Sequence, residues 1–168
     1  DYQLDTELGI NLLFQRQWPE ALAADFAGLH LRTSPHAGLA VGNIYTYANT
    51  GVTVSLMPQR AKWQATQLRV RPSIPGSGYF YVPEGEWAWS VFAGVEGRAV
   101  GRNIFLDGNT FGDSPSVDKK HIVADANVGF SVSYGNIKTA YTLNYRTKEF
   151  YGQDKATLFG AISISYRF

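Results

Sequence analysis

The sequence predicts an all-β protein, an antiparallel outer-membrane β-barrel. Residues 121–168 contain three successive runs in which apolar and polar residues alternate with a period of two, as in strands with one apolar and one polar face. Each run is longer than the usual soluble strand of about 5 to 6 residues and suits a tilted membrane-spanning strand of about 9 to 11. Aromatic residues make up 14% of the chain, with 10 Tyr and 4 Trp, which fits the aromatic girdles of such a barrel.

The three runs differ in polarity but share the pattern. In the run 157–168, apolar residues alternate with small polar ones, and the run ends in an aromatic residue. The apolar residues at every second position are Leu158, Ile162, Ile164, Tyr166 and Phe168. In the run 137–148, one of the two alternating sets of residues is strongly polar, and its side chains could not all face a sandwich core. These residues are Lys138, Thr142, Asn144, Arg146 and Lys148. The run 122–134 is separated from it only by a tight connection, Tyr134–Asn136, which predicts a hairpin.

The first part of the chain shows weaker alternation. A strand is expected from Leu8 to Phe14, ending near Trp18–Pro19 because proline cannot donate to a ladder. A second strand is expected over Asp25–Thr33. Ser34–Pro35 interrupts it, so a bulge is expected there, with the strand continuing over Gly38–Val41.

The middle of the chain holds two further strands and one irregular region. Tyr45–Leu56 changes parity near Asn49–Gly51, which predicts a second bulge. Gln59–Gly85 is rich in proline and glycine and predicts an irregular loop, or a short strand with an excursion. Regular alternation returns over Glu86–Asp107.

Charged residues fall on the polar parity of these strands. Facing a polar lumen lets them pair, whereas a charge facing lipid costs about 2 to 4 kcal/mol at the midplane. We expect a structural network inside a narrow barrel; a proton or substrate path is the other interpretation. Its members are Glu96, Arg98, Asp125, Lys138, Asn144 and Arg146.

Composition excludes several classes of function. The net charge of +1, with no basic block, argues against nucleic acid as the main partner, and no obligate protein partner is evident. The chain has no cysteine, so disulfides, thiol nucleophiles and thiolate metal sites are excluded. No apolar run reaches 18 residues, which excludes a transmembrane helix. A soluble lipocalin-like or sandwich protein with long strands remains the alternative fold.

Loop lengths predict which end of the barrel faces outward. Short turns such as Tyr134–Asn136 are expected in the periplasm, beside the terminal Phe168, and longer loops outside. The expected outer loops are Asp107–Lys119, Phe150–Lys155 and Pro58–Lys62. Cations gather there that could bind the phosphates of lipopolysaccharide, although ordinary loop solvation explains them equally well. They are Arg60, Lys62, Arg102, Lys119, Lys120, Lys148 and Lys155.

Several segments together resemble the lipid A 3'-O-deacylase family of outer-membrane barrels. They are Ser34–Ala48, Arg69–Ser77, Arg102–Ser114 with Val117–Lys120, Tyr145–Phe150 and Ser165–Phe168. The resemblance covers nearly the whole chain and implies a twelve-stranded barrel, of which residues 1–168 would form a single domain of about eight strands, the C-terminal portion. It also implies calcium as cofactor, with the calcium ligands and the catalytic histidine upstream of this chain, so none of those roles is transferred to residues here.

Candidate site residues within the chain are few. His36, beside the expected bulge, is a candidate catalytic base, although a lumen hydrogen-bonding role is the simpler interpretation. His30 is expected to bond in the lumen and His121 to be exposed at a strand start. A second candidate is a partial calcium-loop pattern, Asp107, Asn109 and Asp113; its simpler interpretation is an Asx turn.

The sequence therefore predicts a lipid A deacylase family member in the outer membrane of a Gram-negative bacterium. As the resemblance implies, it would hydrolyse an ester-linked acyl group of lipopolysaccharide, with this chain lacking the catalytic part and inactive alone. The alternative is a small non-enzymatic barrel with a structural or adhesive role. Pairing of the first strand with the last would favour that alternative.

Overall fold

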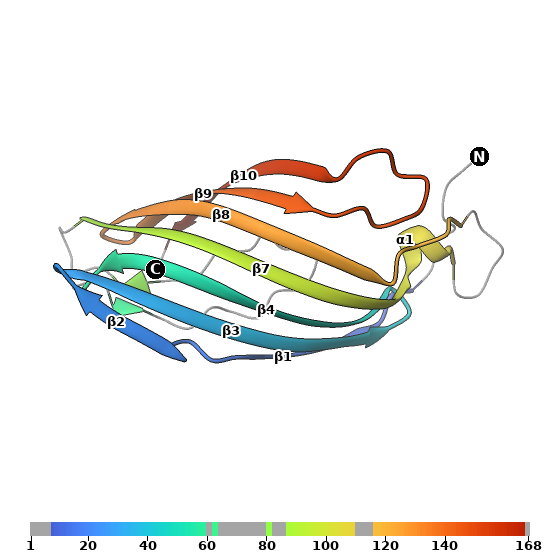
Figure 1. The fold of residues 1–168 in the computed structure, drawn as a ribbon, viewed down its shortest axis with the longest axis horizontal. Coiled ribbons are helices and arrows are strands. Elements are labelled where there is room, and N and C mark those ends of the chain that lie inside the picture. The colour runs from blue at the N-terminus through green and yellow to red at the C-terminus, as the bar shows by residue number, and fades with distance from the viewer. Residues whose placement is uncertain (1–7, 60–61, 64–79, 82–86, 110–115, 167–168) are drawn as a thin grey trace.

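The main strands of the protein form one curved antiparallel sheet, seen in a computed structural model (Figure 1). The structure describes residues 8–59, 62–63, 80–81, 87–109 and 116–166, with only the backbone described for 62–63 and 80–81. The strand order is β1-β3-β4-β7-β8-β9-β10, and β2 also pairs with β3. The main strands are β1 Asn11–Gln17, β2 Leu22–Phe26, β3 Leu29–Gly42, β4 Tyr45–Pro58, β7 Trp87–Asn103, β8 Ile122–Tyr134, β9 Ile137–Arg146 and β10 Thr157–Tyr166. A hairpin of β5 Lys62–Trp63 with β6 Phe80–Tyr81 and a single helix turn, α1 Ile104–Asp107, complete the described elements. The prediction of an antiparallel β-barrel protein is confirmed.

The alternation read from the sequence divides the sheet into an inner, buried face and an outer, exposed face. Along β7, Trp87, Trp89 and Val91 are exposed while Ala88 and Ser90 between them are buried. Most other strands follow, although β2 is exposed at every residue. Apolar residues such as Ile162 and Ile164 of β10 are 70% and 75% exposed. Such exposure of large apolar side chains along whole strands is what a lipid-facing wall requires.

The segment predicted as one strand over Asp25–Thr33 is instead a hairpin. Ala27 and Gly28 both have positive φ, 48° and 77°, which matches the two-residue turn whose twist suits adjoining antiparallel strands. β2 and β3 then pair from Phe26↔Leu29 to Leu22↔Thr33. Ala27 gave no sequence signal because it lacks the preference of Asn or Gly for this backbone conformation.

The bulge predicted at Ser34–Pro35 is also wrong, because β3 passes through it in unbroken register with β4. The irregularity lies in the neighbouring chain, where Trp18 to Ala21 separate β1 from β2 along the same edge of β3. Pro35 has no N–H, but it lies opposite this interruption, and its carbonyl accepts the Trp18 N–H at 2.9 Å. The missing donor therefore falls where the ladder is already irregular.

The second predicted bulge, at Asn49–Gly51, is displaced as well. β4 keeps its register with β3 throughout and shifts against β7 between Thr46 and Tyr47. Tyr47 consequently faces inward, where it is buried in a small apolar cluster with Ala40, Val100 and Val123. The tyrosines that suggested a change of parity are inner-face residues of a regular strand.

The two ends of the sheet differ in their connections. One end, the turn end, carries Ala27–Gly28, Gly135–Asn136 and the connection from β4 to β7, because Pro58 pairs with Leu29. The other end, the loop end, carries α1, the 104–121 connection and the 147–156 connection. The assignment of Pro58–Lys62 to the outer loops is therefore wrong. Arg60 itself lies outside the described residues, as does Phe168.

The sheet has two edges within the described residues. β1 and β2 pair only with β3, and β10 pairs only with β9, so the first strand does not pair with the last. A self-contained closed barrel is thus not formed by these strands. No described segment is a helix long and apolar enough to span a membrane.

Candidate functional site

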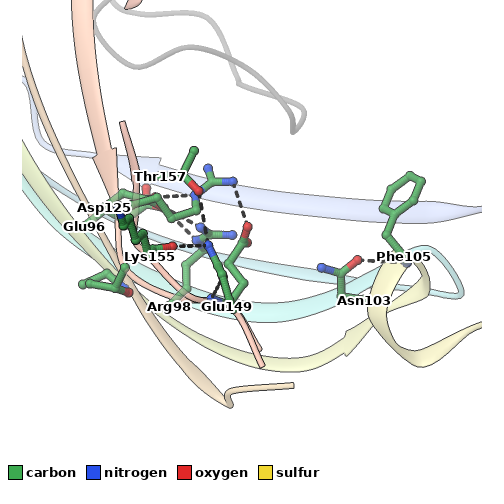
Figure 2. Close-up of polar contacts among 12 residues, drawn as sticks. Glu96, Arg98, Asn103, Phe105, Asp125, Glu149, Lys155 and Thr157 are labelled. Atoms are coloured by element: carbon green, nitrogen blue, oxygen red, sulfur yellow. Dashed lines mark hydrogen bonds and ion pairs between the residues drawn. The ribbon is translucent and has the colours of Figure 1, made fainter. Parts of the chain in front are cut away.

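Charged side chains on the inner face form one continuous row across four strands, which we call the ion row. It consists of His36 on β3, Glu96 and Arg98 on β7, Asp125 on β8, Arg146 at the end of β9 and Glu149 just beyond it. Figure 2 shows Arg98 between the carboxylates of Glu96 and Asp125, with Glu149 close by. The row is the densest group of titratable side chains among the described residues.

Strand register brings these residues together. Glu96 pairs directly with Asp125, and Asp125 with Arg146, so the three side chains emerge side by side on the inner face. Arg98 Nη2 lies 2.6 Å from Asp125 Oδ2, and Arg146 Nε lies 2.6 Å from Asp125 Oδ1. Because such charge-assisted contacts are short and directional, Asp125 is fixed between two guanidinium groups.

His36 reaches this row across a glycine. Gly51 lies between His36 and Glu96 in the sheet, and a Cβ at Gly51 would lie 2.7 Å from Cε1 of the imidazole. The gap allows His36 Nε2 to lie 3.0 Å from Glu96 Oε2, the oxygen that also accepts from Asn49 Nδ2 at 3.0 Å. Glu96 is thus held by several donors, and His36 is a member of a structural network in which it has a carboxylate partner.

The predicted lumen network is confirmed for Glu96, Arg98, Asp125 and Arg146. Lys138 is buried at the turn end of β9, so it lies far along the strand from the row. Asn144 is adjacent to the row and 4% exposed, and both polar atoms of its side chain lack a hydrogen-bond partner among the described residues. The other histidines behave as expected: His30 Nδ1 lies 2.6 Å from Asp25, and His121 is exposed.

The loop end forms a second group of polar residues, the rim. Asn103 caps α1 by accepting the Phe105 N–H at 3.1 Å (Figure 2). The Asn103 N–H in turn donates to Asp107 at 2.8 Å. Asp107 also binds Lys119. Burial alone would raise the pKa of Asp107, but the hydrogen bonds from Lys119 and Asn103 outweigh it and lower that pKa below its usual value.

Within the described residues, the rim does not assemble a calcium site from the candidate loop pattern. Both carboxylate oxygens of Asp107 are used, one by an ammonium group and one by a backbone N–H. Among the described residues no group of three or more acidic or histidine side chains is placed to hold a metal ion. Asn109 lies beside this helix end, and Asp113 lies outside the described residues. The Asx-type bond expected of Asp107 is made instead by Asn103.

The predicted phosphate-binding cations have different roles in the rim. Arg102 donates to the carbonyls of Asn43 and Gly108, so it ties two connections together. Lys119 is paired with Asp107, and its backbone bridges to Phe150. Lys120 lies 5.3 Å from the ring centre of Tyr151, and Lys148 is partly exposed. Lys62 belongs to β5, which follows the turn end, so it does not join this group.

A lipid-facing antiparallel wall and an inner face with paired charges together define an outer-membrane β-barrel protein. Comparison with known families identifies it further. The family model described as "Outer membrane protein LpxR" matches residues 1–168, so this chain belongs to the LpxR family. No curated protein matches.

A solved structure, LpxR from Salmonella typhimurium, has the same fold. It superposes with a TM-score of 0.80 at 23% sequence identity over 99% of this chain. The match covers 54% of the Salmonella chain, so this chain spans about half the length of that structure. The likeness supports the fold, and the outer-membrane location follows from the family.

Proposed function

We propose that this protein takes part in hydrolysing an ester-linked acyl group of lipid A, and that the described residues form the membrane wall and outer rim of that enzyme. The observation that carries the proposal is the junction at the loop end of the sheet, where an apolar wall meets a cationic rim. Lipid A combines acyl chains with phosphates, so its two parts match these two surfaces. Family membership and the resemblance to lipid A 3'-O-deacylases support the same assignment.

Within the rim, Lys120 and Lys148 are the residues that we assign to phosphate. No ion pair of Lys148 is found in the described part of the chain, and the Lys120 ammonium group lies over the ring of Tyr151. Arg102 and Lys119 instead shape the rim through their bonds to Gly108 and Asp107. An ammonium group on a flexible stem suits a phosphate that need not be held in one orientation.

The catalytic groups belong elsewhere in this proposal. Ester hydrolysis needs a base to activate water and an electrophile to hold the oxyanion. His36 is held in the ion row by Glu96, on the inner face, away from the lipid. The resemblance implies calcium as the electrophile, and the described residues do not assemble a ligand set for it.

A chimera tests the proposal. This 168-residue chain is joined to the part of Salmonella typhimurium LpxR that it does not match, and purified lipid A is incubated with the chimera and calcium, then analysed by mass spectrometry. We expect loss of an acyloxyacyl unit that EDTA prevents, and no loss with the 168-residue chain alone. A chimera that inserts into membranes but leaves lipid A intact contradicts the proposal.

The alternative is a non-enzymatic barrel with a structural or adhesive role. The described strands do not support it as a self-contained barrel, because β1 and β10 do not pair. Unpaired backbone groups in hydrocarbon cost several kcal/mol each, so both edges require partners in the membrane. If the chimera is inactive and the 168-residue chain alone runs as a heat-modifiable folded barrel, this alternative is favoured instead.

A further inference from the structure

A shallow groove crosses the outer face of β4, β7, β8 and β9 near the loop end. Its volume is about 310 Å³, at the lower end of ligand-binding pockets, which span about 300 to 1,000 Å³. The floor is formed by Gly97, Ala124 and Ala126, and Val95 and Tyr145 rise beside it. Thr50 and Thr147 line its margins.

Register explains why the wall is hollow here. Thr50, Gly97 and Ala124 are cross-strand partners in one row of the outer face, and Thr147 continues that row by bonding to Ala124 at 2.9 Å. A Cβ placed on Gly97 would meet nothing within 4 Å, so open space lies directly above the backbone. Small residues at adjacent positions of two strands therefore leave a channel that Tyr145 closes on one side.

The groove is continuous with the lipid-facing wall. Val91, Val128 and Leu143 are exposed on the same face, closer to the turn end. β10 ends at the turn end, where Tyr166 pairs with Ile137, and the terminal aromatic residue of such a barrel is expected at the periplasmic rim, which places the groove toward the outer leaflet. Lys148 follows Thr147 at the outer end of the groove, so an anionic headgroup above an acyl chain would meet a cation there.

We propose that the groove binds one acyl chain of lipid A, with a lipid A phosphate at Lys148. The choice of lipid A rests on the proposed function, whereas the groove itself does not. Lipid tails are as apolar as the wall, so burial from water does not drive binding in the membrane. Binding instead comes from van der Waals contact, which small residues strengthen by letting the chain approach the backbone closely.

Filling the groove tests this proposal. The protein is extracted from outer membranes in mild detergent, and native mass spectrometry measures binding of lipid A and of phosphatidylglycerol in EDTA, which prevents calcium-dependent hydrolysis. Ala124→Trp should reduce lipid A binding at least fivefold. Ala93→Trp is the matched control, because Ala93 is exposed on the same face of β7 but does not line the groove. It should bind lipid A as the unmodified protein does.

Each outcome decides a separate point. Heat-modifiable migration on gels reports folding, and Gly97→Leu replaces Ala124→Trp if that variant does not fold. Unchanged lipid A binding in either folded variant overturns the proposal, as does equal binding of phosphatidylglycerol and lipid A by the unmodified protein. The readout here is binding and not hydrolysis, so the two proposals can fail separately. If the enzyme proves inactive but Ala124→Trp still reduces lipid A binding, only the proposed function is refuted.

Discussion

Replacing Arg98 by methionine should destabilise the barrel more than any other single change in the ion row. The Arg98 side chain is 5% exposed, and its guanidinium bridges Glu96 and Asp125. Methionine keeps much of the volume and removes the charge. Two largely buried carboxylates, 16% and 11% exposed, then lose a common partner. Glu96 keeps His36, and Asp125 keeps Arg146.

The expected magnitude follows from these contacts. Unit charges about 4 Å apart interact by roughly 4 kcal/mol at the effective dielectric constant typical of proteins. Breaking a buried pair on one side costs about 3 to 5 kcal/mol, since a charge is left uncompensated. The retained partners place Arg98→Met near the lower limit, about 3 kcal/mol, or roughly a hundredfold in the folding equilibrium.

Urea unfolding in lipid vesicles, followed by tryptophan fluorescence, measures this change. The chain contains 4 Trp, and Trp87 and Trp89 are exposed on the outer face, so their emission reports departure from lipid. Arg98→Met should cost about 2 kcal/mol less in an Asp125→Asn background, because the two residues are directly coupled. A free energy of unfolding within about 0.5 kcal/mol of the unmodified protein, the range of uncoupled surface changes, refutes the reasoning.

Three further predictions concern other parts of the wall and rim. The pKa of Asp107 is lowered, so the pairing of Asp107 with Lys119 stabilises the rim at a pH above 3.8, the usual pKa of the group, and is lost as the pH falls below that value. Hydrogen exchange of the rim should therefore become faster in acid, and Asp107→Asn should abolish that increase. Gly129→Ala places a Cβ against the backbone carbonyl oxygen of Tyr141 and 2.5 Å from the Phe92 ring, and should cost about 1 to 3 kcal/mol in urea unfolding. Asn144→Leu removes a buried amide without a partner among the described residues and should leave stability unchanged or raise it by about 1 kcal/mol.

The first two of these predictions have a control variant, and the third has an outcome that contradicts it. Asp154→Asn tests the pH effect, since Asp154 is an exposed carboxylate near the rim and should leave the acid response intact. Gly97→Ala controls for the general effect of adding a methyl group, because its Cβ has open space. A Gly129→Ala protein as stable as Gly97→Ala would show that both the Phe92 ring and the Tyr141 backbone move to accommodate the methyl group. A loss of more than about 1 kcal/mol in Asn144→Leu would indicate that Asn144 has a bonded partner, such as a buried water.

Much of the wall could be predicted from sequence because a membrane strand repeats one physical demand at every second residue. The parity of Ile137, Leu143 and Tyr145 against Lys138 and Thr142 needs no knowledge of the neighbouring strand. Bulges are different, because they depend on two strands at once. The irregular segment beside Pro35 and the shift opposite Tyr47 arise from pairing partners far away in sequence.

The candidate site divides in the same way. That Glu96 and Arg98 would pair on the inner face follows from their shared parity, and the structure confirms it. The access of His36 to Glu96 depends on Gly51, a residue of the intervening strand, so it required the register of three strands. The groove over Gly97 was missed for the same reason, since small residues become a cavity only when rows align.

The ion row also fixes the register of the strands that carry it. Because side chains alternate between faces, a slip of one residue in β7 would turn Glu96 and Arg98 toward lipid and Val95 and Gly97 inward. A lipid-facing arginine costs about 2 to 4 kcal/mol near the midplane, and the slip would also break the contact of Arg98 with Asp125. The apolar outer face alone would penalise such a slip weakly here, since the outer residues near Gly97 are small. Where the outer face is hollow, the register between neighbouring strands is therefore specified by the charged residues on the inner face.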